Sequence, residues 1–319
     1  MVTTIAFGES KTLNWVNVTD KAEWQARDSA GEFVFQDHLW ILGGWFDAKA
    51  PNPRDVWTSR NGKVWTRIVE VAPWAYSDLS VVLIHRNRMW VMGGRKLPGK
   101  DNSNEVWSSP DGAAWTLEGR AGWCPRVSPA FAVFKGRMWV LGGTESFYDH
   151  SDAMVKNDVW SSADGKEWRL ETPNAGWSKR AHAQALVFDN KLWILGGGLW
   201  DPQHVALNDV WCSEDGVYWT QVTEAAPWKP RLWFSAVVYR GRMWVLGGWS
   251  KENGNFAEVW HSKDGKNWTE LKSDVIWKGR HEHSAFVFQD KIWVAGGHAD
   301  PVNSEVWSLS VPVDWFKDP

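Results

Sequence analysis

The feature that most constrains this chain is a motif of one tryptophan and a di-glycine that recurs six times. Each copy is a short apolar run that ends in Gly-Gly. The copies are LWILGG (39–44), MWVMGG (89–94), MWVLGG (138–143), LWILGG (192–197), MWVLGG (243–248) and IWVAGG (292–297). They follow one another at intervals of about fifty residues, a period typical of repeat architectures. The chain is therefore expected to be built from six copies of one structural unit.

A second motif, Asp or Glu followed by Val-Trp, comes after each di-glycine. Its copies are DVW (55–57), EVW (105–107), DVW (158–160), DVW (209–211), EVW (258–260) and EVW (305–307). In the first five repeats an Asn-Gly or Asp-Gly turn follows, then a third tryptophan: Trp65, Trp115, Trp168, Trp219 and Trp268. Such turns supply the positive φ angles that tight hairpins need. Each repeat therefore predicts four short strands and no long helix.

One four-stranded meander cannot bury both its faces, whereas six arranged radially can pack on one another. A strand ending in Gly-Gly, a loop, Asp/Glu-Val-Trp and a spaced tryptophan resemble the kelch repeat, of the bacterial kelch and galactose-oxidase central-domain type. The resemblance covers nearly the whole chain and implies an all-β, six-bladed β-propeller. The S-x-D-G-x-x-W turns also resemble the Asp-box of sialidases but are one residue shorter, so we interpret them as hairpins.

A fourth tryptophan precedes each first strand and indicates how the ring closes. These residues are Trp24, Trp74, Trp123, Trp177, Trp228 and Trp277. Trp15 precedes Trp24 by the same interval that separates Trp65 from Trp74, so residues 11–20 are expected to form the outer strand of the last blade. Trp315 competes for that place, but its segment contains Pro312, which cannot donate a ladder hydrogen bond. The predicted organisation is one domain, 1–319, with blades at 24–70, 74–120, 123–172, 177–224, 228–273 and 277–310 and a tail at 311–319.

Composition narrows the classes of partner and compartment. The 319 residues carry 35 basic and 38 acidic side chains, a net charge of -3, which gives no reason to expect binding to nucleic acid or an anionic membrane. Cys124 and Cys212 form no disulfide framework or zinc-type cluster. No leader peptide or membrane-spanning run is visible. We expect a cytoplasmic monomer with a small-molecule ligand and no cofactor or metal; a mature secreted form would have the same composition.

The tryptophans outside the repeat pattern are the first candidates for a binding surface. Of 29 tryptophans, four per blade, counting Trp15, belong to the pattern. Those left over, besides Trp315, are Trp45, Trp200, Trp233 and Trp249. The kelch resemblance implies that the loop leaving the second strand and the loop entering the first strand surround one mouth of the channel. Aromatic faces gathered there suit sugars, aromatic ligands or cations.

The remaining candidates stand in the same two loops. The third residue after the fourth tryptophan is arginine in five blades: Arg27, Arg126, Arg180, Arg231 and Arg280, with Ser77 in the other. An arginine that recurs in five blades is expected to have a structural role, in capping carbonyls or bridging adjacent loops. A guanidinium also binds a carboxylate or phosphate well, so a ligand-binding role stays open. The positions that follow differ between blades and include Asp28, Ser29, Asp78, Ser128, His182, His281, Glu282 and His283. Arg95 and His298 follow Gly-Gly directly. We predict a shaped pocket that binds a small polar ligand, anionic or carbohydrate-like.

Three other functions remain open. Glu282, His182 or His281 could act as an acid or base with Arg180 or Arg231, in a metal-independent isomerase, mutarotase or lyase. The propeller could instead be a protein-interaction module. In an extended WKGRHEHSAF segment, His281 and His283 would share a side that Glu282 faces away from, so His281, His283 and His298 could meet at a metal.

Overall fold

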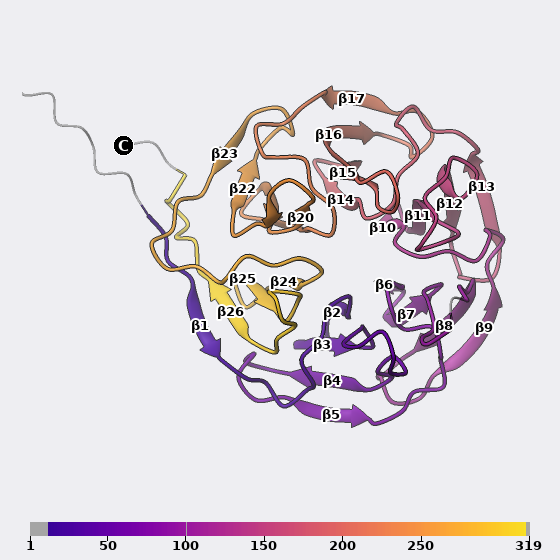
Figure 1. Cartoon of the computed structure of the whole chain (residues 1–319), viewed down its shortest axis with the longest axis horizontal. Helices are drawn as coiled ribbons and strands as arrows, with labels where there is room; N and C mark the ends of the chain where they lie inside the picture. The colour runs from indigo at the N-terminus through magenta and orange to yellow at the C-terminus, as the bar shows by residue number, and fades with distance from the viewer. Residues whose placement is uncertain (1–11, 100, 317–319) are drawn as a thin grey trace, which may run out of the picture.

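The chain forms a ring of six four-stranded antiparallel sheets around a central axis (Figure 1). The computed structural model describes residues 12–99 and 101–316. The expected all-β, six-bladed propeller is confirmed. Within these ranges, no helix is long and apolar enough to cross a membrane.

The blades follow chain order, and each runs outward from the axis. Blades 1 to 3 consist of β2 Gly31–Phe35, β3 His38–Leu42, β4 Val56–Ser59, β5 Thr66–Val69; β6 Val81–His85, β7 Arg88–Met92, β8 Glu105–Ser109, β9 Thr116–Arg120; β10 Ala130–Phe134, β11 Arg137–Thr144, β12 Val155–Ser162, β13 Trp168–Thr172. Blades 4 to 6 consist of β14 Gln184–Phe188, β15 Lys191–Leu199, β16 Val205–Ser213, β17 Thr220–Thr223; β18 Ser235–Tyr239, β19 Arg242–Leu246, β22 Val259–Ser262, β23 Trp268–Glu270; β24 Ser284–Phe288, β25 Lys291–Ala295, β26 Val306–Leu309, β1 Val16–Thr19. A small ribbon, β20 Trp249–Ser250 with β21 Gly254–Asn255, leaves blade 5.

The two inner strands of each blade are joined by a two-residue hairpin turn. In blade 1, Gln36 and Asp37 occupy the turn with φ of 49° and 55°, so both residues are left-handed, as a type I′ turn requires. The repeat tryptophan of the second strand closes the hairpin: Trp40 Nε1 donates to the Phe35 carbonyl at 2.9 Å. The same bond recurs in the other five blades.

The Asp-Gly turns of the outer hairpins also join neighbouring blades. In blade 2, Ser109 Oγ accepts from the Gly112 N–H at 2.8 Å, and Asp111 Oδ1 accepts from the next two N–H groups at 2.9 Å. Gly112 has φ of 78°, and a Cβ there would lie 2.5 Å from Trp40 of blade 1. The turn must therefore end in glycine, both for its backbone conformation and for contact with the adjacent blade.

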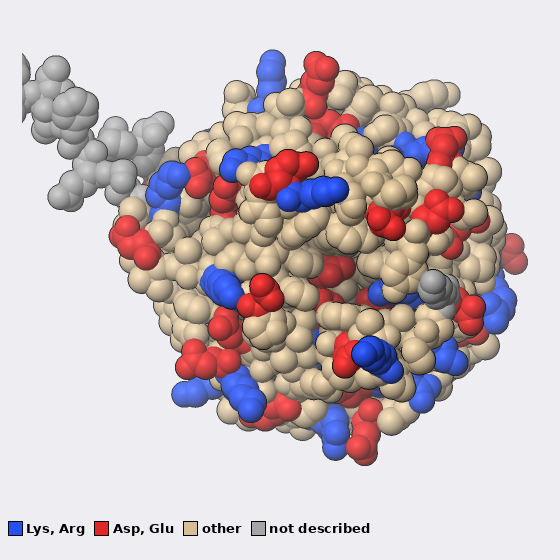
Figure 2. Space-filling view, viewed as in Figure 1, with Lys and Arg blue, Asp and Glu red and all other residues tan. Residues whose placement is uncertain are grey.

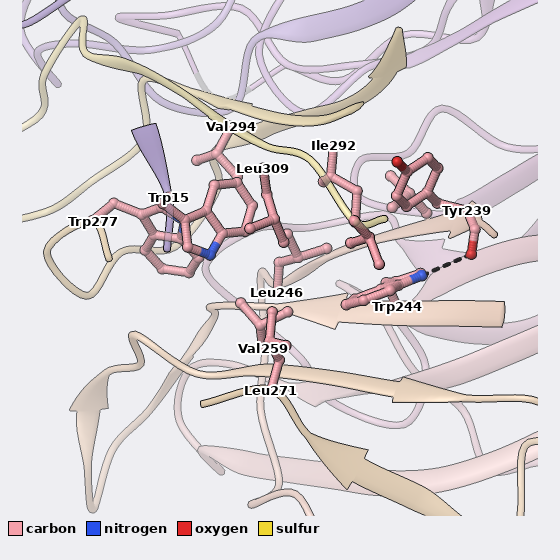
Figure 3. Packing of buried hydrophobic residues seen from close by; sticks show 12 residues of the cluster. Trp15, Tyr239, Trp244, Leu246, Val259, Leu271, Trp277, Ile292, Val294 and Leu309 are labelled. Carbon is pink, nitrogen blue, oxygen red and sulfur yellow. Dashed lines mark hydrogen bonds between the residues drawn. The ribbon is translucent and has the colours of Figure 1, made fainter. Parts of the chain in front are cut away.

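The N-terminal strand closes the ring, as predicted. In β1, Val16 pairs with Ser308 and Asn17 with Trp307 of β26. Trp15 is buried and contacts Trp277 edge-on at 5.9 Å (Figure 3). The same edge-on contact joins the third and fourth tryptophans of the other five blades. Trp315 lies outside the sheet, partly buried against the same hydrophobic cluster. Residues 11 and 317–319 of the predicted segments lie outside the described residues.

Candidate functional site at the channel mouth

Five arginines of the entry loops lie buried in ion pairs. Arg126 Nη1 and Nη2 donate to the Asp158 carboxylate at 2.6 and 2.9 Å, and Nη1 also donates to the Gly142 carbonyl at 2.9 Å. The equivalent ion pairs are Arg27–Asp55, Arg180–Asp209, Arg231–Glu258 and Arg280–Glu305. All five side chains are at most 1% exposed. The carboxylates of the Asp/Glu-Val-Trp motif occupy these guanidiniums, as the structural alternative from the sequence expects, and binding of a ligand by these arginines stays a prediction.

The mouth has the same backbone frame in all six blades. The residue after Gly-Gly forms an isolated β-bridge with the fourth residue after the entry tryptophan, as in Asp28 with Trp45 and His281 with His298. The next residue along the entry loop is left-handed in every blade, with φ between 50° and 58°. These residues are Ser29, Leu79, Ser128, His182, Trp233 and Glu282. The two predicted mouth segments therefore lie side by side at one end of the channel.

The six left-handed residues form a ring at the neck of the channel. Backbone hydrogen bonds pass between blades, from the Glu282 N–H to the Trp233 carbonyl at 2.8 Å and from the Ser29 N–H to the Glu282 carbonyl at 3.0 Å. Left-handed φ is costly for residues other than glycine and persists only where the surroundings fix it. All six side chains line a central cavity of about 110 Å³, which has room for several water molecules or one small head group.

Aromatic rings from blades 4 and 5 form one wall of the mouth. The rings of Trp200, Trp233 and Trp249 contact one another with centroids 4.8 to 5.7 Å apart. The His182 ring lies 4.8 Å from that of Trp233 and stacks on His150 at 5.5 Å. This wall holds three of the four tryptophans that the sequence singled out for the mouth.

The wall continues through blade 6 to blade 1. The His281 ring lies 5.3 Å from Trp233 and stacks on His298 at 5.0 Å. His298 in turn stacks on Trp45, with centroids 6.2 Å apart. The fourth of these tryptophans therefore joins the same wall.

Carboxyl groups from blades 1, 2 and 6 lie beside the end of this wall, where His298 Nδ1 and Asp28 Oδ2 are 3.2 Å apart. Arg95 Nε and Nη2 donate to Asp78 Oδ2 at 2.8 and 2.5 Å, in a pair that is almost fully buried. Ser29 Oγ donates to Asp28 Oδ1 at 3.1 Å, and Glu282 lies close enough for its charge to act on both aspartates. The space-filling view shows acidic side chains in the central depression (Figure 2).

These carboxyl groups hold their protons more tightly than ordinary ones. Burial, and next the charge of Asp78, raise the pKa of Asp28 well above its usual value. Burial, and next the charge of Asp28, do the same to the pKa of Glu282. The pKa of Asp78 is also raised by burial, although Arg95 opposes the change. Deeper in the channel, burial raises the pKa of Glu32 to about 8. Glu32 is therefore largely protonated at neutral pH, and the pKa values of Asp28, Asp78 and Glu282 are shifted in the same direction.

The buried histidines at the mouth are neutral at the same pH. Burial, and next the charge of His150, lower the pKa of His182 well below its usual value. Burial lowers the pKa of His281 to about 3 and that of His150 to about 4. The acid and base candidates therefore differ in direction: burial raises the pKa of Glu282 and lowers the pKa values of His182 and His281. Because Arg180 and Arg231 are held in ion pairs, Arg95 is the guanidinium beside these acid and base candidates, and catalysis by Glu282, His182 or His281 stays a prediction.

The HEH segment does not have the extended geometry expected of it. Glu282 has φ of 50°, which breaks the simple alternation of side chains. Glu282 and His283 both line the central cavity, whereas His281 Nδ1 contacts Asn255 Oδ1 at 2.6 Å and its ring stacks on His298. Stacked rings do not aim their in-plane nitrogens at one point. Among residues 12–99 and 101–316, no group of three or more His, Cys, Asp or Glu is placed to hold a metal.

The sequence reasoning missed Glu32, His150 and Phe147. Glu32 pairs with Ile41 at the position where the first strands of other blades carry Val82 or Phe131, so a comparison of the repeats would have found it. His150 and Phe147 lie in the long loop of blade 3, where the Arg95 guanidinium lies 3.9 Å over the Phe147 ring. The interval from Gly-Gly to Asp-Val-Trp is longer in blade 3 than in any other blade, so its extra residues give no repeat signal.

No family model matches the chain. A segment of 134 residues is 32% identical to part of the dynein alpha chain of the flagellar outer arm from Chlamydomonas reinhardtii. The match covers 40% of this chain and 3% of the dynein chain, so it extends over a small part of that relative.

Proposed function

We propose that the chain is a kelch-type propeller whose mouth binds a small carbohydrate-like ligand. The recurring Gly-Gly and tryptophan motifs support the kelch type. The observation that carries the ligand class is the meeting of the aromatic wall and the carboxyl cluster at one mouth. Flat aromatic faces pack on the apolar faces of sugar rings, while carboxyl and imidazole groups bond to hydroxyls. The arginine ion pairs remove the main support for an anionic ligand.

Loss of one wall tryptophan tests this proposal. In a calorimetric and thermal-shift screen of neutral and amino sugars at neutral pH, at least one should bind the wild type and raise its Tm. Trp249→Ala should weaken that binding by roughly tenfold, because a stacked aromatic contributes about 1 to 2 kcal/mol. The control is Tyr218→Ala, whose side chain is 79% exposed and stands away from the mouth. A Trp249→Ala variant that binds as tightly as the control would contradict the proposal.

A protein-interaction module is the second candidate, and the dynein match favours it. That relative is named as a chain of the flagellar outer arm, and its aligned segment supports a role for this propeller within a larger assembly. A partner captured by the wild type and lost with Trp249→Ala would favour this function over small-molecule binding. Equal capture by both proteins would count against the mouth as the docking site.

A further inference from the structure

The acidic side of the mouth carries more carboxyl groups than its cations neutralise. Asp28, Asp78 and Glu282 meet there, and Glu32 lines the cavity below. Within the described ranges, the ion pair from Arg95 to Asp78 is the sole one that joins these four groups to an arginine or lysine. Burial and the mutual repulsion of the carboxylates raise the pKa values of Asp28 and Glu282. A cation placed among these groups would relieve that repulsion.

Polar groups without partners lie in the same cavity and beside it. Asp78 Oδ1, Ser128 Oγ and both ring nitrogens of His182 are buried and have no hydrogen-bond partner among the described residues. Asp78 is fully buried and His182 is 4% exposed, and both His182 and Ser128 line the cavity. Since buried polar groups are normally hydrogen-bonded, this concentration at one place points to a bound molecule. It is an observation independent of the acidic residues' charge.

We infer that the ligand carries a protonated amine, held among Asp28, Asp78 and Glu282, while its ring packs on the wall of Trp200, Trp233 and Trp249. An ammonium group has three donors and forms charge-assisted hydrogen bonds to carboxylates. Indole faces attract cations as well as sugar rings. The inference rests on the proposed function and narrows it to amino sugars and similar small amines.

Binding of such a ligand releases protons from the cluster. An ammonium favours the ionised form of the carboxyl groups, so their pKa values fall when it binds. The other titratable or charged groups that face the cluster or line the cavity with it are Glu32, Arg95, His182, His281, His283 and His298. Because His182 and His281 are neutral at neutral pH, the released protons come from the carboxyl groups.

Matched sugars test the inference. Calorimetry at neutral pH compares glucosamine, galactosamine and mannosamine with the parent sugars and the N-acetyl derivatives. At least one amine should bind about tenfold or more tightly than its two neutral relatives, as expected for one added charge-assisted contact. Repeating the titration in buffers of different ionisation enthalpy should show proton release for the amine and none for the neutral sugars.

Two carboxyl variants show whether the amine, and not only the sugar ring, is recognised at the mouth. Glu282→Gln should bring the affinity ratio of amine to parent sugar toward one, whereas Glu70→Gln, with a 74% exposed side chain, should preserve it. Asp28→Asn gives the same readout if Glu282→Gln does not fold. Parent sugars that bind as tightly as the amines would overturn the inference and leave the proposed function standing. If no sugar of either kind binds, both are wrong.

Discussion

At the scale of single residues, the channel holds carboxylic acids where a propeller core would ordinarily be apolar. Glu32 occupies a first-strand position that is Val82 in blade 2 and Phe131 in blade 3. Burial raises its pKa from 4.5 to about 8, although a hydrogen bond from the Ala285 backbone opposes the change. A buried carboxyl group of this kind lowers the free energy of unfolding at high pH. A role of Glu32 in the site therefore explains its presence better than a role in stability does.

Glu32→Gln should remove a pH-dependent weakness. The folded protein binds the Glu32 proton more tightly than the unfolded chain does, so the free energy of unfolding falls as pH rises from 4.5 to about 8. Glutamine does not titrate, and above pH 8 the variant should exceed the wild type by on the order of 2 kcal/mol, because the open channel screens part of the shift. Near pH 4.5 the two should agree. Thermal unfolding across this range checks the effect.

The control for this change is Glu70→Gln at an exposed site, which should leave the pH profile as it is. The buried histidines act in the opposite direction: the pKa values of His281 and His283 lie at about 3, so they lower stability as pH falls below 6.5. That effect is common to all variants and cancels in the comparison. A Glu32→Gln profile parallel to the wild type would contradict the assignment.

At the scale of elements, the entry loops of five blades are each fastened to their own blade by a buried arginine. Arg126→Ala should cost about 3 to 5 kcal/mol, because it leaves the Asp158 carboxylate without its partner at a largely buried position. Blade 2 supplies the control, since Ser77 replaces the arginine there and Glu105 pairs with Arg120, which is 64% exposed. Arg120→Ala should cost less than about 1 kcal/mol. Urea unfolding measures both, and equal costs would refute a fastening role.

The strands and the closure were predictable from the sequence because they depend on features that repeat. Six copies of the di-glycine motif defined the blades, and the interval from Trp15 to Trp24 identified the closing strand before any contact was known. The role of Arg126 was not predictable in this way. Its partner Asp158 lies in another motif, and the chain pattern does not say which loop reaches which strand.

The chemistry of the mouth was predictable only in part. The tryptophans outside the repeat pattern were found because they break the repeat. Their positions in the mouth loops were enough to predict that they lie together, as they do in the aromatic wall. The left-handed backbone at Glu282 was not visible, since glutamate gives no signal for positive φ. The direction of its side chain, and with it the carboxyl cluster, follows from backbone bonds to neighbouring blades.

At the scale of the whole molecule, the C-terminal tail completes a contact that the repeats leave unfinished. In five blades the turn glycine packs on the second-strand tryptophan of the preceding blade, as Gly112 does on Trp40. Blade 6 has no Asp-Gly turn, because β26 leads directly into the tail. Its preceding blade presents Trp244, which is nevertheless fully buried. Phe316 occupies this place, with its ring 6.2 Å from Trp244 and 5.0 Å from His261.

Phe316→Ala should therefore loosen the seam between blades 5 and 6. The Arg242 guanidinium also lies 3.8 Å over the Phe316 ring, so the substitution removes both apolar burial and a cation–π contact. We expect a loss of about 1 to 3 kcal/mol in the free energy of unfolding, measured in urea, with faster hydrogen exchange in β19 and β22. Val313→Ala, in the same tail at 71% exposure, should change stability by less than about 0.5 kcal/mol. If both variants unfold at the same urea concentration, the tail does not take the place of the missing turn, and the seam is held by the core residues of blades 5 and 6 with Trp15.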